Sequence, residues 1–418
     1  MRCNNKFCRL MCVCFVCVLV LVQVCAQVGA QEKSVLFSYR GGRNYILVEK
    51  TDLLRYDNAK YTGLMSREVQ SFVSESNALK SHSSDDNASG EALYYDGYFY
   101  VVQDTKHKKR VVLEGIHDSI SSQFKITKDG ELVMIEDNGY PSFRSFPSYP
   151  SGKVKVGDSW QAQGMRAVDP LNTGIVTKMP IMVQYTFVRE DVYNGEAVYV
   201  LNAAWATRYG LSYIDADGDP SLKSAQGKHD ATIIVSQKIG NALVVKDTVD
   251  ETFLYDDGNQ VRFKGTISLF TKYPPSYNKN DVVSAVKRTL PVLNDSSLDV
   301  RETEKGIRIT IDLKFKADSA ELLDSEKLRL DKIASVLKES APDSHYLIEG
   351  HTASTGNPSG EQRLSEERAR SVAEALASRG ISAQQFICSG KGSSVPVDDN
   401  ATAQGRAKNR RVEITILQ

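Results

Sequence analysis

The chain has 418 residues, and its 52 lysines and arginines balance its 52 aspartates and glutamates. A formal net charge of zero provides no basic field for nucleic acid or for an anionic lipid surface. The length is enough for two or three hydrophobic cores, so we expect a multi-domain protein.

The first thirty residues have the pattern of a secretory signal peptide. Basic residues precede an apolar stretch from Leu10 to Val22, which is too short to span a bilayer as a stop-transfer helix. Small residues allow cleavage after Ala26 or Ala30. We therefore expect export to the periplasm, a mature protein without a transmembrane helix, and a location that is peripheral to the outer membrane rather than integral.

All cysteines except Cys388 lie in this segment, so the mature protein is expected to have no internal disulfide. Cys25 as a lipidation site is disfavoured, because the residues before it, Val22 to Val24, lack the small side chain that such a site normally carries.

Residues 31–276 alternate apolar and polar positions between turn clusters, as in "EALYYDGYFYVVQ" and "DATIIVSQKIGNALVVKDTVDETFLY", which predicts β-strands. The alternation alone does not decide whether these strands form one large sheet or two. Pro147 and Pro150 interrupt strand pairing, which favours two all-β domains, residues 31–148 and residues 149–276.

Residues 277–418 have a different pattern, which predicts a linker followed by an α+β domain. Two strands in "LDVRETEKGIRITIDLKF" precede an amphipathic helix with Leu330, Ile333 and Leu337 on one face, and the last strand is "RRVEITIL".

A second helix in this domain follows the turn "GHTASTGNP". Ser359 and Gln362 have the spacing of a capping box, which predicts a helix start at Ser359. Arg368 then falls on the apolar side of this helix. A guanidinium there must reach solvent, pair with a neighbouring carboxylate or meet an anionic ligand, because it cannot lose its proton.

Five segments in order resemble the OmpA-like C-terminal domain: "FKADSAEL" (315–322), "GHTASTG" (350–356), "LSEERARSV" (364–372), "SGKGSSVPVDDN" (389–400) and "GRAKNRRVEI" (405–414). The resemblance implies a βαβαββ sandwich that clamps the diaminopimelate of the peptidoglycan stem peptide in a groove. The whole chain also resembles spirochaetal multi-domain envelope proteins that carry this domain.

The resemblance implies a set of ligand-binding residues. The arginine that grips the ligand carboxylate corresponds to Arg368, whereas the aspartate that takes the ammonium corresponds to Ala353. The remaining groove positions are Lys316, His351, Thr352, Glu361, Asn409 and Arg410. Loss of one partner of a desolvated charge pair costs on the order of 2 to 5 kcal/mol, so we expect weak or no diaminopimelate binding.

Glu361 lies on the same side of the helix as Arg368 and leaves two alternatives open. Its carboxylate could replace the missing aspartate as partner of an ammonium, or it could fill the anion site of Arg368 from within.

No other pattern indicates a cofactor, a metal or catalysis. "DADGDP" (215–220) resembles a calcium loop but has Pro220 where glycine is needed and Gln226 at position twelve. The six histidines lack ligand spacing. We therefore expect a non-enzymatic protein whose partner is the peptidoglycan stem peptide or another envelope component. The alternatives are an integral outer-membrane β-barrel with a peptidoglycan-binding periplasmic tail and, ranked last, an enzyme of envelope metabolism.

Overall fold

The computed structural model describes residues 33–82, 92–106, 109–113, 115–210, 218–289 and 299–418. The predicted signal peptide, residues 1–30, lies outside this range, as do Asp215 and Asp217 of the rejected calcium loop. Within the described residues, no helix is both long and apolar enough to cross a membrane.

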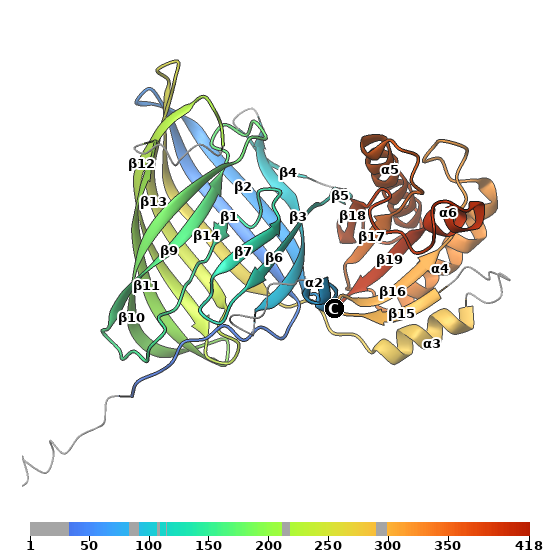
Figure 1. The fold of residues 1–418 in the computed structure, drawn as a ribbon, viewed down its shortest axis with the longest axis horizontal. Helices are drawn as coiled ribbons and strands as arrows, with labels where there is room; N and C mark the ends of the chain where they lie inside the picture. Colours follow the sequence, from blue (N-terminus) through green and yellow to red (C-terminus); the bar gives the residue numbers. More distant parts are fainter. Residues whose placement is uncertain (1–32, 83–91, 107–108, 114, 211–217, 290–298) are drawn as a thin grey trace, which may run out of the picture.

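The N-terminal strands form one curved, barrel-like sheet (Figure 1). In the described residues this sheet has 13 strands in the order β7-β6-β3-β2-β1-β14-β13-β12-β11-β10-β9-β8, and β4 pairs with β3. The elements are β1 (Tyr45–Asp57), β2 (Lys60–Glu75), α2 (Asn77–His82), β3 (Leu93–Lys106), β4 (Lys109–Val112), β6 (Ile120–Ile126), β7 (Leu132–Glu136), β8 (Phe143–Arg144), β9 (Ser159–Val168), β10 (Thr177–Tyr193), β11 (Glu196–Tyr209), β12 (Leu222–Ser236), β13 (Ala242–Tyr255) and β14 (Gln260–Lys272).

The prediction of two all-β domains, residues 31–148 and 149–276, is wrong. Strand β1, from the first predicted domain, pairs along its whole length with β14 from the second, with Val48 opposite Phe270. Strands β8 and β9 pair with each other across Pro147 and Pro150. Period-two alternation identifies strands but not their partners, and the two prolines lie in a connection within one sheet.

The two ends of the strand order, β7 and β8, meet through a side chain instead of a backbone ladder. The backbone N–H of Leu132 donates to the hydroxyl oxygen of Ser145 at 3.0 Å. The sheet therefore encloses an interior (Figure 1).

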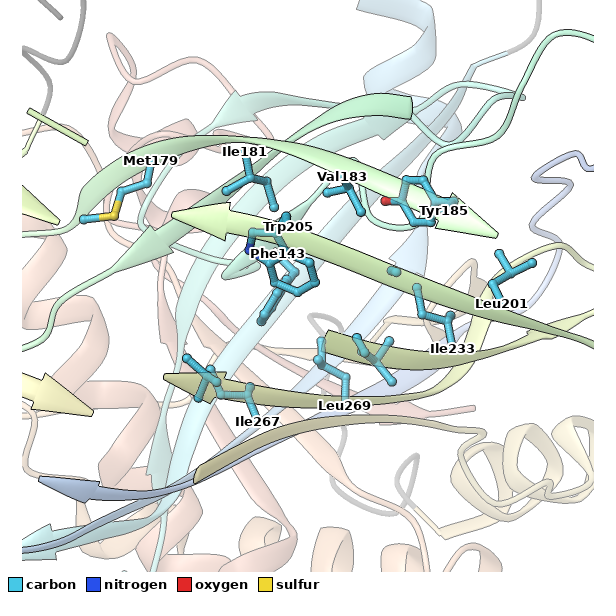
Figure 2. Close-up of a cluster of buried hydrophobic side chains, with 14 of the residues drawn as sticks. Phe143, Met179, Ile181, Val183, Tyr185, Leu201, Trp205, Ile233, Ile267 and Leu269 are labelled. Atoms are coloured by element: carbon cyan, nitrogen blue, oxygen red, sulfur yellow. The ribbon is translucent and has the colours of Figure 1, made fainter. Parts of the chain in front are cut away.

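The interior is filled mainly by apolar and aromatic side chains. Met179, Ile181, Val183 and Tyr185 alternate along β10 and point inward with Trp205 of β11 (Figure 2). Alternate residues on the outer face are mostly polar. The alternation predicted from the sequence thus separates a dry inner face from a wet outer face.

The C-terminal domain has the predicted α+β order. Its elements are α3 (Lys279–Thr289), β15 (Asp299–Thr303), β16 (Gly306–Ile311), the 3-10 turn η2 (Asp324–Glu326), α4 (Lys327–Ser340), β17 (Tyr346–Gly350), α5 (Pro358–Ala377), the 3-10 turn η3 (Ala383–Gln385), β18 (Phe386–Gly390), α6 (Ala403–Asn409) and β19 (Val412–Leu417). The sheet order is β15-β16-β19-β17-β18-β5, where β5 (His117–Asp118) comes from the N-terminal half. Helices α3, α4 and α5 pack over one face of this sheet.

The other face of the C-terminal sheet packs against the outside of β1, β2 and β3. Leu347, Ile387 and Leu417 form a buried apolar cluster with residues that include Val48 and Phe72. Strand β5 extends the same contact by pairing in parallel with β18. The two domains are therefore docked sheet against sheet (Figure 1).

Candidate functional site

A groove of about 520 Å³ lies at one end of the C-terminal sheet. Its walls come from the segment after β16, the loop after β17, the middle of α5 and the end of α6. Of the residues predicted as ligand-binding, the lining includes Lys316, His351, Thr352, Ala353, Arg368 and Arg410. The structure brings these six together, and their role in binding stays a prediction.

Helix α5 carries Arg368 and starts differently from the prediction. The N-cap is Asn357, whose side-chain oxygen accepts from the backbone N–H of Gly360 at 3.2 Å, and Pro358 occupies the first turn. The predicted cap, Ser359, instead donates its hydroxyl to Asn357 at 3.2 Å. Asparagine and serine are both good N-cap residues, so the local sequence left the cap two residues uncertain.

The guanidinium of Arg368 lies in the groove and makes no ion pair with any of the described residues. Its Nε donates to the backbone oxygen of Ser319 at 3.1 Å, and its Cζ lies 4.9 Å from the centre of the Phe315 ring. Burial and the neighbouring Arg410 lower the pKa of Arg368 from its ordinary value, while Asp318 opposes this. The Arg368 side chain therefore still has donors to offer to an anion.

The position that should carry the acid, Ala353, is buried in the groove wall with 4% exposure. The two preceding side chains are also buried, and in the described part of the chain neither ring nitrogen of His351 nor Oγ1 of Thr352 has a hydrogen-bond partner. Burial and Arg411 lower the pKa of His351 to about 4, so its ring is neutral at pH 7. The described residues of this wall carry no carboxylate, and the two acidic side chains in the groove lining, Asp312 and Asp318, come from the segment after β16.

Glu361 takes neither of the two roles considered for it. Its carboxylate accepts from the hydroxyl of Thr355 at 2.9 Å and from the hydroxyl of Ser393 at 2.5 Å, and it also accepts from the backbone N–H groups of Thr355 and Asn357. These hydrogen bonds, the one from Ser393 first, lower the pKa of Glu361 to about 2. Glu361 therefore joins two loops and does not line the groove.

Asn409 is also structural. It is fully buried, its side-chain oxygen accepts from the backbone N–H groups of Val397 and Asp398 at 2.8 and 3.0 Å, and its amide donates to the backbone oxygen of Asp398. It fixes the loop before α6 and does not line the groove.

The sequence prediction missed three further cationic side chains in the lining, Lys314, Arg406 and Arg411. Arg411 donates through Nε to Glu413 at 2.7 Å, and Arg406 donates to the backbone oxygens of Asn400 and Ala401. The clustered arginines in "GRAKNRR" were a signal for this wall. Together with Arg368 and Arg410 they give the groove a cationic character that suits an anion better than an ammonium group.

The sequence profile described as the OmpA family matches residues 314–410, which contain almost all of this groove. The outer-membrane lipoprotein YfiB of Pseudomonas aeruginosa is 34% identical over 127 residues, which are 30% of this chain and 75% of that protein. The chain belongs to the OmpA family.

Other OmpA-family relatives match over the same domain. The outer membrane porin F of Pseudomonas aeruginosa is 37% identical over 26% of this chain and 31% of its own length. The peptidoglycan-binding protein ArfA of Mycobacterium tuberculosis is 40% identical over 24% of this chain and 31% of its own length. An outer membrane protein structure from Borrelia burgdorferi B31 has 34% identity, covers 30% of this chain and all of its own, and has a TM-score of 0.26. The chain thus spans about a third of the length of the first two curated relatives.

Proposed function

We propose that this protein is a non-enzymatic component of the cell envelope whose OmpA-like domain lies at the peptidoglycan layer but binds diaminopimelate weakly or not at all. The names of the relatives, which include porins, lipoproteins and a peptidoglycan-binding protein, support the envelope setting. The signal peptide expected at residues 1–30 fits a periplasmic location.

The observation that carries the proposal is the asymmetry of the groove. Arg368 faces the groove without an ion pair among the described residues, whereas Ala353 stands where an ammonium would need a carboxylate. A zwitterionic ligand would keep its carboxylate contact and leave its ammonium desolvated and unpaired. Lysines and arginines outnumber the two aspartates of the groove lining, Asp312 and Asp318, which favours a ligand with a carboxylate or another anionic group.

Calorimetric titration of the purified protein with diaminopimelate tests this proposal. The native protein should give no measurable binding, and Ala353→Asp should gain affinity by at least about 30-fold, because it restores one desolvated charge partner. The asparagine in Ala353→Asn has nearly the same shape as the aspartate but no charge, so this variant should show no measurable binding.

Two results would contradict the proposal. Tight diaminopimelate binding by the native protein would mean that another group takes the ammonium. An Ala353→Asp variant whose new affinity survives Arg368→Gln would mean that the ligand does not use the groove as proposed.

A membrane-embedded barrel is the second candidate, because the N-terminal sheet nearly closes on itself. Its polarity argues against this role. Lys246, Thr248 and Asp250 alternate on the outside of β13, while Val245 and Val249 face the interior. A membrane barrel needs the reverse arrangement, with an apolar band outside. We therefore infer a peripheral location.

Carbonate extraction of membranes distinguishes the two locations. A peripheral protein should appear in the supernatant after the alkaline wash. Retention in the pellet, with the N-terminal half protected from protease, would instead establish an integral barrel.

A further inference from the structure

Charged residues occupy several inward positions near the middle of the barrel-like sheet. They are Glu49 on β1, Arg67 on β2, Arg166 on β9, His229 on β12, and Asp247 and Glu251 on β13. Burial of such groups is costly unless they are paired and hydrogen-bonded. The pairing of each group therefore shows which of them serve only to hold the fold together.

Four of these residues pair with one another through hydrogen bonds. A guanidinium nitrogen of Arg166 donates to Glu251 at 2.8 Å, Nδ1 of His229 lies 2.7 Å from Asp247, and Thr207 donates its hydroxyl to Glu251. Burial opposes ionisation of Glu251, but Arg166 and His229 outweigh it and lower its pKa to about 2. The charges of this cluster are paired within the protein, and only Oδ1 of Asp247 lacks a hydrogen-bond partner among the described side-chain atoms of the cluster.

Glu49 and Arg67 are different. They sit diagonally on the paired strands β1 and β2, since Glu49 is opposite Val69 and Arg67 is opposite Thr51. In the described residues neither makes an ion pair. The Nε of Arg67 is buried without a partner, and its terminal nitrogen is 3.5 Å from Asn172. The carboxyl of Glu49 accepts a hydrogen bond from the hydroxyl of Ser142.

Both side chains line a cavity of about 260 Å³. Its other walls include Met65, Phe253, Phe263 and Ile267, so a polar end faces an apolar body. Met65, Arg67 and Asn172 also line a neighbouring groove of about 340 Å³, which places Arg67 where the groove meets the cavity. Past Phe143, which belongs to both linings, the interior continues into a smaller apolar cavity of about 100 Å³.

Glu49 and Arg67 differ in whether they can lose their charge. A carboxyl can take up a proton and become a hydrogen-bond donor, whereas a guanidinium remains charged. Burial does raise the pKa of Glu49, against the opposing effects of Ser142, Arg67 and Arg166. Arg67 is the cation of the lining that has no ion pair in the described residues, while the carboxylate of Asp169, which also lines the cavity, accepts from the backbone N–H groups of Thr173 and Gly174.

We propose that the interior of the barrel-like sheet binds a small amphiphile with a carboxylate head, held by Arg67, and an apolar tail that packs against Phe253, Phe263 and Ile267. This inference concerns the N-terminal domain and does not depend on the function proposed for the OmpA-like groove.

Calorimetric titration of the full-length protein with decanoate, a ten-carbon carboxylate, tests the proposal, with decanol as the neutral comparison. The native protein should bind decanoate more tightly than decanol. Arg67→Met keeps an apolar stem without the charge and should weaken decanoate binding by about 10- to 100-fold, since it removes a charge-assisted hydrogen bond.

Two control variants show whether the loss of decanoate binding is specific to Arg67. Glu49→Gln retains a donor at the head of the cavity and should preserve decanoate binding. Arg262→Met removes an arginine from the outer face of the same sheet and should leave binding unchanged. A melting temperature for each variant shows that the fold is intact.

Four outcomes would overturn the proposal. They are absence of binding by decanoate and by the shorter octanoate, equal affinity for decanol, an Arg67→Met variant with native affinity, and loss of decanoate binding in Glu49→Gln.

Discussion

The OmpA-like groove and the interior of the barrel-like sheet both hold arginines, but these arginines are stabilised in different ways. Arg368 lies at the edge of the groove with a backbone oxygen and an aromatic ring as neighbours. Arg166 is almost fully buried, and it meets Glu251 and His229 within hydrogen-bond distance. The first can use water or a ligand, while the second depends on protein groups alone.

This difference indicates where a charged residue can be replaced with little loss of stability. A groove arginine needs no acidic partner from the protein, because Arg368 is met by the backbone oxygen of Ser319 and the Phe315 ring and remains open to water or a ligand. A charge in the barrel interior does not, because a single deletion leaves its partners desolvated. Substitutions in the two regions should therefore differ in their effect on folding, and three of them sharpen the comparison.

The largest effect is expected from Glu251→Leu. The change leaves Arg166 and His229 buried without their shared carboxylate, and it should lower the free energy of unfolding by about 3 to 5 kcal/mol. Urea denaturation followed by tryptophan fluorescence measures this, because Trp205 stacks on His229 with ring centres 4.4 Å apart.

The adjacent residue supplies the matched control. Asp250 pairs with Arg262 at 2.7 Å on the outer face of the same sheet, so Asp250→Asn should change stability by less than about 1 kcal/mol. Equal effects of the two substitutions would contradict the distinction between inner and outer charges.

The same contrast explains how far sequence reasoning could go. The groove was predictable because its parts are short contiguous segments with characteristic residues, such as "GHTASTG" and the helix that carries Arg368. The interior network was not, because Arg166 and Glu251 are 85 positions apart and meet only after β9 and β13 enter one sheet. The single sheet itself depends on the pairing of β1 with β14, which alternation cannot reveal. The role of Glu361 was missed for the same reason, since Ser393 lies 32 positions away.

A second, smaller effect is expected where the two domains meet. The Glu349 carboxylate accepts from the Tyr98 hydroxyl at 2.8 Å and lies 3.7 Å from Nζ of Lys391, while Lys305 donates to Tyr98 at 2.6 Å. Burial opposes ionisation of Glu349, but Lys305 and Lys391 outweigh it and lower its pKa to about 2. Glu349→Leu should cost about 2 to 3 kcal/mol, because it leaves Lys391 and the Tyr98 hydroxyl without this carboxylate, while Lys305 keeps its ion pair with Asp96.

Calorimetry of this variant shows whether the network couples the domains. We expect one unfolding transition of the native protein to separate into two in Glu349→Leu. Glu302→Gln, which removes an exposed ion pair with Lys279, should not separate the transitions. A single transition in both variants would mean that the apolar contact of Leu347, Ile387 and Leu417 is sufficient for coupling.

The smallest effect, and the one with a distinct pH dependence, is expected from Glu361→Gln. The carboxylate accepts hydrogen bonds from Thr355, Asn357 and Ser393, and its loss should lower the free energy of unfolding by about 1 to 2 kcal/mol at pH 7. Its pKa of about 2 in the folded protein lies below the value of about 4.3 in an unfolded chain. The stabilisation is therefore complete above about pH 5 and is lost as the pH falls toward about 2.

Urea denaturation of the native protein and of Glu361→Gln at pH 7 and pH 3 measures this pH dependence. The difference in the free energy of unfolding between the two proteins should be smaller at pH 3. Glu367→Gln, on an exposed turn of the same helix, should show a small difference that does not vary in this way. A Glu361→Gln effect independent of pH would mean that the loop contact does not require the ionised carboxylate. The loops of the OmpA-like domain would then differ from the barrel interior less than their hydrogen bonds indicate.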